Sequence, residues 1–347
     1  MNIDMEYLLN MMKKYMDIPS PGGYTKIAIE EARLDFEKLG LKTVITKKGA
    51  LIATLEGKNT EEEIIISAHM DTLGAMVKEI EADGKLKYKR IGGGCFGSIE
   101  GENCHIITES GREISGSVMP RTASTHIYGQ EVANLSRNEN NMIIRIDEKV
   151  ETKKDVLDIG INVGDFIYMD TRTKITESGF VKSRYLDNKL AVAMVFEVCR
   201  YLKQNKITPC CTTKFYISNY EEMGHGVSGN NISDKVKEMV AIDIAPVGKE
   251  QESSEYAVTI AAKDRKSVYD YELRRKLSGI AKENNIDYRV DVFNFYSSDA
   301  THVILQGGDF KFACIGPGVD STHHYERTHF SAIENNVKLL VKYIENN

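Results

Sequence analysis

The sequence has no long apolar run and no cluster of basic residues. A helix that spans a bilayer needs about 18 or more consecutive apolar residues, and the apolar segments of this chain are interrupted well before that length. Lys and Arg together number 45 against 51 Asp and Glu, so the net charge is −6 and no basic surface for nucleic-acid phosphates is expected. We therefore expect a soluble protein that binds neither membranes nor nucleic acids.

Cysteine is also scarce, and its spacing is not that of a zinc knuckle or a redox motif. The six cysteines include no C-x-x-C pair, and Cys210 and Cys211 precede an apolar strand, where we interpret them as packing residues. The N-terminal segment contains Asp4 and Glu6 where a secretory signal would be basic. We therefore expect reduced thiols and a cytoplasmic location.

What the sequence does have is apolar content for a sizeable core, since 41% of its 347 residues are hydrophobic, and a length that allows about two domains. Helix and strand patterns alternate before residue 74 and again from Asp187 onward, which predicts an α/β fold with an open sheet covered by helices. Between residues 74 and 173, glycines separate short alternating runs such as Met142–Ile146, which indicate a small β-rich domain. We therefore predict a main domain of residues 1–73 and 174–347, interrupted by an inserted domain of residues 74–173.

Polar side chains follow the predicted strands of the main domain. In an open α/β sheet the ligand crevice lies outside the carboxyl ends of the strands, so side chains at these ends should converge. The side chains are His69 and Asp71 after Ile64–Ala68, Glu221 and Glu222 after Thr213–Asn219, Asp243 after Met239–Ile242, His323 beyond Lys311–Ile315, and Asp187 at the start of the helical run Asn188–Leu202.

This set of side chains predicts a site for two divalent metal ions. Two imidazoles and several carboxylates without thiolates suit zinc or cobalt, and paired ions lie roughly 3.5–4 Å apart in such sites. His69 and Asp243 could serve one ion and Glu222 and His323 the other, with Asp187 bridging both. Each ion then has three protein ligands and an open position for water or substrate.

Asp71 and Glu221 remain for catalysis. Asp71 lies two residues after His69 and so points to the same side of an extended chain, where its carboxylate can accept from the free ring nitrogen of His69. Glu221 and Glu222 are consecutive and cannot both face one ion from a regular strand. We assign Glu222 as the ligand and Glu221 as the general base, which takes a proton from the attacking water and passes it to a leaving amine.

Some nearby residues have both a structural and a functional interpretation. A single histidine at a strand end is more often hydrogen-bonded than metal-bound, so the site prediction depends on the whole set. His126 in the inserted domain could reach over an active site. Asp299 could hold the amino terminus of a substrate, but an Asp before a helical run also serves as an N-cap. We interpret four other histidines as structural residues or as residues at the rim of the site: His225, His302, His324 and His329.

Six short segments follow one another along nearly the whole chain: Ala68-His69-Met70-Asp71, Tyr185-Leu186-Asp187-Asn188, Tyr220-Glu221-Glu222-Met223-Gly224, Ala241-Ile242-Asp243, Ser298-Asp299-Ala300 and Gly316–His323. Together they resemble the dinuclear metalloaminopeptidase family, which includes glutamyl aminopeptidase and the tetrahedral-shaped aminopeptidases and has members labelled endoglucanase. The chain departs from the pattern at Thr72, where many relatives have Glu, and at Asn188, where many have a second Asp. His323-His324-Tyr325 replaces the commoner His-Ser-Pro, which leaves His323 and His324 open as alternative ligands.

The resemblance implies a zinc-exopeptidase-like fold, with helices on both faces of a three-layer mixed sheet and an inserted domain used for dimerisation. It implies an exopeptidase that removes amino-terminal residues from peptides, whose dimers can assemble into a hollow dodecamer. It also implies the site assignment given above, with two zinc or cobalt ions. The implied ligands are His69, Asp187, Glu222, Asp243 and His323, and the implied catalytic carboxylates are Asp71 and Glu221.

Three other functions are alternatives at this point. Glycoside hydrolysis generally needs two carboxyl groups that face each other across about 5–10 Å, a geometry that the adjacent Glu221 and Glu222 do not supply. An N-acyl-amino-acid deacylase or a carboxypeptidase could use the same two-metal core. A non-catalytic oligomeric scaffold is the alternative from another class, although every proposed ligand is present.

Overall fold

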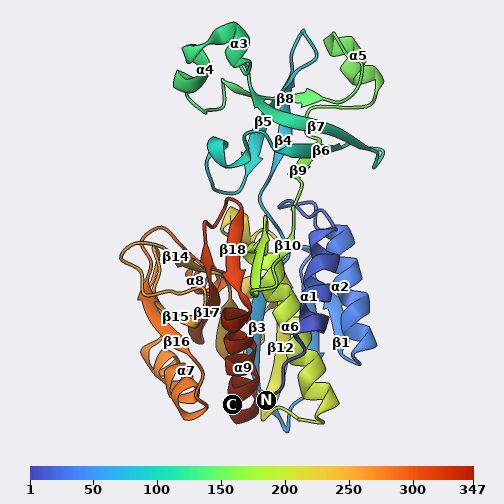
Figure 1. Cartoon of the computed structure of the whole chain (residues 1–347). Helices are drawn as coiled ribbons and strands as arrows, with labels where there is room; N and C mark the ends of the chain where they lie inside the picture. The colour runs from blue at the N-terminus through green and yellow to red at the C-terminus, as the bar shows by residue number, and fades with distance from the viewer. The chain divides into compact units, whose positions relative to one another are not determined.

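The computed structural model describes residues 1–347 and divides the chain into two compact units (Figure 1). The main unit comprises Met1–Asp71 and Arg172–Asn347, and the inserted unit comprises Thr72–Thr171. Each junction lies two residues before the position expected from the sequence. Asp71 belongs to the main unit, where its carboxylate accepts hydrogen bonds from the backbone N–H groups of Glu221 and Glu222.

The main unit is built on one mixed sheet of 12 strands. The strands are β1 (Lys42–Ile45), β2 (Leu51–Leu55), β3 (Asn59–His69), β10 (Lys174–Ile175), β11 (Phe180–Ser183), β12 (Cys211–Ser218), β13 (Val236–Ile242), β14 (Ala245–Val247), β15 (Val258–Lys263), β16 (Tyr288–Val292), β17 (Lys311–Asp320) and β18 (Glu326–His329). Their order is β1-β2-β12-β3-β13-β17-β18-β11-β10, and β14 and β15 also pair with β17, while β16 pairs with β15.

Four neighbouring strands at the centre of this sheet run parallel. β12 pairs with β3, β3 pairs with β13, and β13 pairs with β17, each in the parallel sense. The carboxyl ends of the four strands therefore meet at one edge of the sheet. These are the four strands after which the sequence carries its polar residues, so the topology brings those segments to the same place.

The middle of β3 is buried on both faces, as its unbroken apolar sequence predicts. Ile64, Ile65 and Ile66 are each at most 2% exposed. Ile65 belongs to an apolar cluster that includes Met239 of β13 and Cys314 of β17. Burial of each such aliphatic side chain contributes about 1.5–3 kcal/mol. This packing fixes the strand whose last residue is His69.

Helices lie on both faces of the sheet, which confirms the expected three-layer α/β architecture. They are α1 (Met5–Met16), α2 (Lys26–Lys38), α6 (Leu186–Gln204), α7 (Tyr271–Glu283), α8 (Asp299–Leu305) and α9 (Phe330–Asn346), with short 3-10 turns η2 (Glu221–Met223) and η3 (Gly229–Asn231). α8 contributes Ala300 and Val303 to the Ile65 cluster, whereas α6 packs against β3 and also contacts α1 and α9 (Figure 1). None of the helices combines the length and the apolar character that a membrane span requires.

The inserted unit is a closed barrel of six strands in the order β4-β5-β8-β7-β6-β9. Its elements are β4 (Gly74–Ile80), β5 (Leu86–Ile91), η1 (Phe96–Ile99), β6 (Asn103–Ile107), β7 (Glu113–Pro120), α3 (Thr125–Tyr128), α4 (Gln130–Asn134), β8 (Met142–Ile146), α5 (Lys153–Asp158) and β9 (Phe166–Met169). A Cβ atom at Gly116 in β7 would lie 2.6 Å from the carbonyl oxygen of Arg145 in β8, so the close approach of these strands requires glycine. The sequence predicted a β-rich insert but not its closure.

A buried carboxylate in β13 supplies a stability test with a defined pH dependence. Glu238, which is 9% exposed, accepts hydrogen bonds from Tyr343 (2.7 Å), Lys276 (3.1 Å) and Asn347 (2.9 Å). Burial alone would raise the pKa of Glu238, but the hydrogen bond from Tyr343 and the charge of Lys276 outweigh it and lower this pKa. A carboxyl group with a lowered folded-state pKa stabilises the fold above its unfolded pKa of about 4.3 and loses this contribution as the pH falls.

We therefore expect Glu238→Gln to lower the free energy of unfolding by about 1–3 kcal/mol at pH 7. The difference from the wild type should shrink as the pH is lowered below about 4. Urea unfolding of both proteins across this pH range measures the effect. Equal free energies of unfolding for the two proteins at pH 7 would show that the carboxylate charge of Glu238 does not stabilise the fold.

Candidate metal centre

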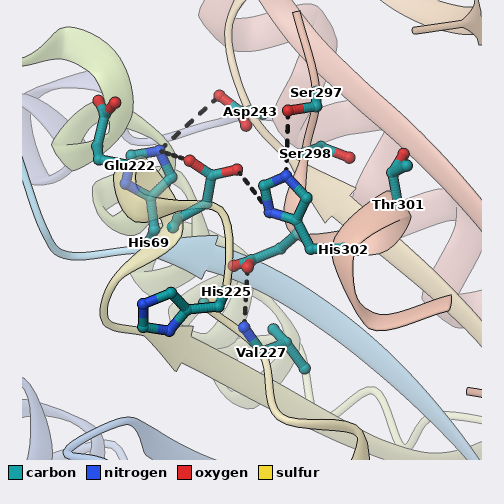
Figure 2. Close-up of polar contacts among 12 residues, drawn as sticks. His69, Glu222, His225, Val227, Asp243, Ser297, Ser298, Thr301 and His302 are labelled. Carbon is teal, nitrogen blue, oxygen red and sulfur yellow. Dashed lines mark hydrogen bonds and ion pairs between the residues drawn. The ribbon is translucent and has the colours of Figure 1, made fainter. Parts of the chain in front are cut away.

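Two groups of three ligand atoms lie at the carboxyl edge of the central strands. The first contains His69 at the end of β3, Asp187 at the start of α6, and Asp243 directly after β13. His69 Nε2 lies 3.0 Å from Asp187 Oδ1 and 4.0 Å from Asp243 Oδ1. All three residues are buried. Figure 2 shows the His69 ring directed toward Asp243.

The second group contains Asp187 again, with Glu222 and His323. His323 Nε2 lies 3.4 Å from Asp187 Oδ2 and 3.6 Å from Glu222 Oε2. Asp187 thus turns one carboxylate oxygen toward each histidine. In each group the three ligand atoms lie within 4.8 Å of one another. The structure therefore brings together all five residues that the sequence nominated as ligands, in the same two sets.

Unusual backbone conformations at or next to the proposed ligands set the direction of their side chains. Tyr185, Tyr220 and His323 have positive φ angles of 65°, 73° and 63°. Such a left-handed conformation costs a non-glycine residue about 1–3 kcal/mol and is concentrated at functional sites. Asp187 itself has non-helical angles (φ −78°, ψ 98°), so it precedes the regular part of α6 and is free to face the strand ends.

Asp71 acts differently from the sequence-based expectation. The ring nitrogen Nδ1 of His69 lies 2.8 Å from the main-chain oxygen of Asp71, and 3.8 Å from its carboxylate. The carboxylate instead accepts from the backbone N–H groups of Glu221 (3.1 Å) and Glu222 (3.2 Å). The expectation that this carboxylate orients His69 is therefore wrong, because the tight η2 turn places two N–H donors against it. Asp71 fixes that turn, and its carbonyl orients the ring.

Glu326 is a buried carboxylate that the sequence did not nominate. It accepts hydrogen bonds from the backbone N–H of Asp187 (3.1 Å) and from that of His323 (3.0 Å). Burial and the charge of Asp187 raise the pKa of Glu326 to about 8. It therefore connects the segments that carry two proposed ligands. The only hint in the sequence was its position three residues after His323. A carboxylate that binds backbone N–H groups produces no recognisable sequence motif, because every residue type except proline offers such a donor.

The site is rich in acidic groups and suited to cations. Burial raises the pKa of Glu222 to about 7 and that of Asp71 to about 6, and it raises the pKa values of Glu221 and Asp243 well above their ordinary range. Burial disfavours the charged ring of His323, but the charge of Glu222 together with the hydrogen bond and charge of Asp187 outweighs this and raises the pKa of His323 to about 10. Glu222 Oε1 is buried without a hydrogen-bond partner. Divalent cations would supply the missing positive charge, and imidazole and carboxylate donors are ligands that zinc and cobalt accept.

Residues 49–339 match the family of the M42 glutamyl aminopeptidase. The chain belongs to this family. A protein of Bacillus subtilis strain 168 named "Putative aminopeptidase YhfE" is 42% identical over 337 residues, which span 97% of each chain. The resemblance seen in the sequence motifs is confirmed, and the chain is an aminopeptidase, a hydrolase of peptide bonds.

Two solved structures show that this aminopeptidase shares its fold with distant relatives. The TET aminopeptidase from the marine sediment archaeon Thaumarchaeota archaeon SCGC AB-539-E09 superposes with a TM-score of 0.88 at 17% identity, over 97% of this chain and 96% of that one. The Pyrococcus horikoshii TET1 peptidase gives a TM-score of 0.84 at 22% identity, over 97% of this chain and 99% of that one.

The other residues that the sequence offered as candidates lie outside the two ligand groups. His323 lies in the second ligand group, whereas His324 is exposed and its carbonyl accepts from Arg184. Asp299 accepts from Ser218 and from the backbone N–H of Val227, so both of its oxygens already have protein donors. Two further candidates are also exposed. They are His126, in α3 of the inserted unit, and His225, which stacks on Tyr220.

Proposed function

We propose that this aminopeptidase removes amino-terminal residues from peptides with two divalent ions per chain, zinc or cobalt, held by the two ligand groups. His69 and Asp243 would hold one ion, Glu222 and His323 the other, and Asp187 both. The supporting observation is the position of Asp187, whose two oxygens face the two histidines at 3.0 Å and 3.4 Å. A shared carboxylate is the arrangement expected of a dinuclear site.

Glu221 is the proposed general base. It is buried next to the first ligand group, with Oε2 3.9 Å from His69 Nε2, yet it belongs to neither group. When bound, the ions would polarise the scissile carbonyl and stabilise the negative charge that develops on its oxygen. Glu221 takes a proton from the attacking water and gives it to the leaving amine. Asp71 acts as a positioning residue, since its carboxylate holds the backbone N–H of Glu221.

Peptide hydrolysis with matched substrates tests this function. Each short peptide is offered with a free and with an acetylated amino terminus, before and after chelator treatment and with Zn²⁺ or Co²⁺ restored. Cleavage of only the free-amine set, lost with chelator and recovered with metal, is expected. Cleavage of the acetylated set would assign a deacylase or carboxypeptidase, and no cleavage with two ions bound would indicate a scaffold.

We also propose that the chain forms homo-oligomers through the inserted unit. The Pyrococcus horikoshii TET1 peptidase, which shares this fold, can assemble into a tetrahedron or a large octahedral shell. In the inserted unit Ile127 and Val163 are 75% and 64% exposed, and contact with a second copy would remove such apolar side chains from water. Sedimentation should give a particle heavier than the 39.0 kDa chain, and a monomer at all concentrations would contradict the proposal.

Glu326 provides a test of the ligand assignment from outside both groups. Glu326→Ala should weaken metal binding by about 10–100-fold, the usual effect of removing a residue that orients ligands. Metal-buffered titration of the purified protein measures the affinity. Glu255→Ala is the matched control, because the Glu255 carboxylate pairs with Arg327 (2.8 Å), the residue after Glu326. Equal metal affinities for the two variants would remove Glu326 from the site.

A further inference from the structure

A third group of ligand atoms lies beside the two described above. Glu221, Asp299 and His302 are all buried, and one ligand atom from each lies within 4.8 Å of the other two. Asp299 and His302 come from α8, and Glu221 comes from η2. Figure 2 shows that His302 and His69 approach the centre of the site from different elements. None of the three residues belongs to the two ligand groups of the proposed catalytic ions.

Two atoms of this third group are buried without partners. His302 Nδ1 and Glu221 Oε1 have no hydrogen-bond partner, although both residues are more than nine-tenths buried. The two atoms lie 3.6 Å apart, which is too long for a good hydrogen bond. Ligand atoms that share a tetrahedral zinc ion at about 2.0–2.2 Å lie roughly 3.4 Å from each other. The spacing of the two atoms is therefore that of metal ligands.

Hydrogen bonds hold Asp299 and His302 of this group in place. Asp299 accepts from Ser218 and, at 2.8 Å, from the N–H of Val227, and a Cβ atom on Gly226 would lie only 2.1 Å from its Oδ1. Each carboxylate oxygen keeps a further acceptor position after one hydrogen bond. The Nε2 atom of His302 lies 3.1 Å from Ser297 Oγ (Figure 2), which fixes the ring. The other ring nitrogen, Nδ1, lies 3.6 Å from Glu221 Oε1.

The surroundings of His302 favour the neutral ring, which is the form that binds metal ions. Burial and the charge of Lys266 lower the pKa of His302, so its ring is neutral near pH 7. The charge of Lys266 also opposes a bound cation. A cation here would therefore bind more weakly than at a site without a neighbouring ammonium group.

We propose that Glu221, Asp299 and His302 form a third, lower-affinity zinc site whose occupancy inhibits the enzyme. A zinc ion bound to Glu221 Oε1 competes with protons for this carboxylate, so it withdraws the base from the reaction. The inhibitory consequence rests on the proposed role of Glu221 in peptide hydrolysis. The binding of a third ion depends only on the three side chains.

The test compares the wild type with His302→Gln, which keeps a polar side chain but removes the imidazole ligand. Equilibrium dialysis against a Zn²⁺ series, with metal content read by mass spectrometry, should give a third ion per chain in the wild type. Removing residues that merely orient ligands already changes affinity by about 10–100-fold, so the third affinity should fall at least about tenfold in the variant. His225→Ala is the matched control, because it removes an exposed imidazole near η2 that belongs to none of the three ligand groups.

Peptidase activity in the same zinc series gives the second measurement. The activity of each protein is compared with its own activity when two ions are bound. Excess zinc should inhibit the wild type and His225→Ala. Inhibition of His302→Gln should need at least about tenfold more zinc. Thermal unfolding checks that His302→Gln folds. If this variant does not fold, His302→Asn takes its place in both measurements. Saturation of the wild type at two ions, or equal inhibition of wild type and folded variant, overturns the third site. No cleavage at two ions would instead reject the proposed function, while the third ion would still be counted by dialysis.

Discussion

Glu221→Gln should lower kcat by about 10²–10⁴-fold, the usual contribution of a general base, while the protein still binds two metal ions. Glutamine has the shape of glutamate but cannot take up the proton of the attacking water. The backbone N–H of Glu221 would still donate to Asp71, because this bond does not involve the replaced side chain. The loss is therefore expected in kcat with little change in KM.

The neighbouring residue supplies the control for this prediction. Glu222→Gln alters a proposed ligand whose Oε2 lies 3.6 Å from His323 Nε2, so it should lower the metal content together with the activity. Metal analysis and steady-state kinetics of both variants separate the two roles. If Glu221→Gln retained wild-type kcat, or if it lost metal as Glu222→Gln does, the assignment of base and ligand to these adjacent residues would have to be abandoned.

Much of this fold and the positions of the candidate ligands could be anticipated from the sequence. The run Ile64–Ile66 is buried on both faces, and unbroken apolar segments of this kind mark central parallel strands. Once β12, β3, β13 and β17 are neighbours, the residues after them must share one edge of the sheet. Strand ends therefore carry spatial information that single residues lack.

What the sequence could not give depends on the backbone. Asp71 was expected to face His69, but Tyr220 adopts φ 73° and the η2 turn directs two N–H groups into the Asp71 carboxylate. Glu326 contacts only the backbone N–H groups of two proposed ligands, and any residue type offers such donors. The meeting of Glu221 with His302 likewise depends on how α8 packs, since 81 positions separate the two residues in the chain.

Asp187→Ala should remove the binding of both ions, because this side chain is the only one in both ligand groups. Zinc supplied at 100 times the Kd of a site stabilises the folded state by about 2.7 kcal/mol. Two occupied sites should therefore give the wild type about 5 kcal/mol over the metal-free protein, and this gain should vanish in the variant. Chemical unfolding with and without zinc measures the difference.

Asp243→Ala distinguishes a shared ligand from an ordinary one. Asp243 belongs to the first group alone, so its loss leaves Asp187, Glu222 and His323 in place and should retain roughly half of the zinc-dependent stabilisation. Equal losses in the two variants would mean that the two ions bind only as a pair. A zinc response in Asp187→Ala as large as that of the wild type would show that the ions are held elsewhere. The ratio of the two losses therefore measures how far Asp187 couples the two sites.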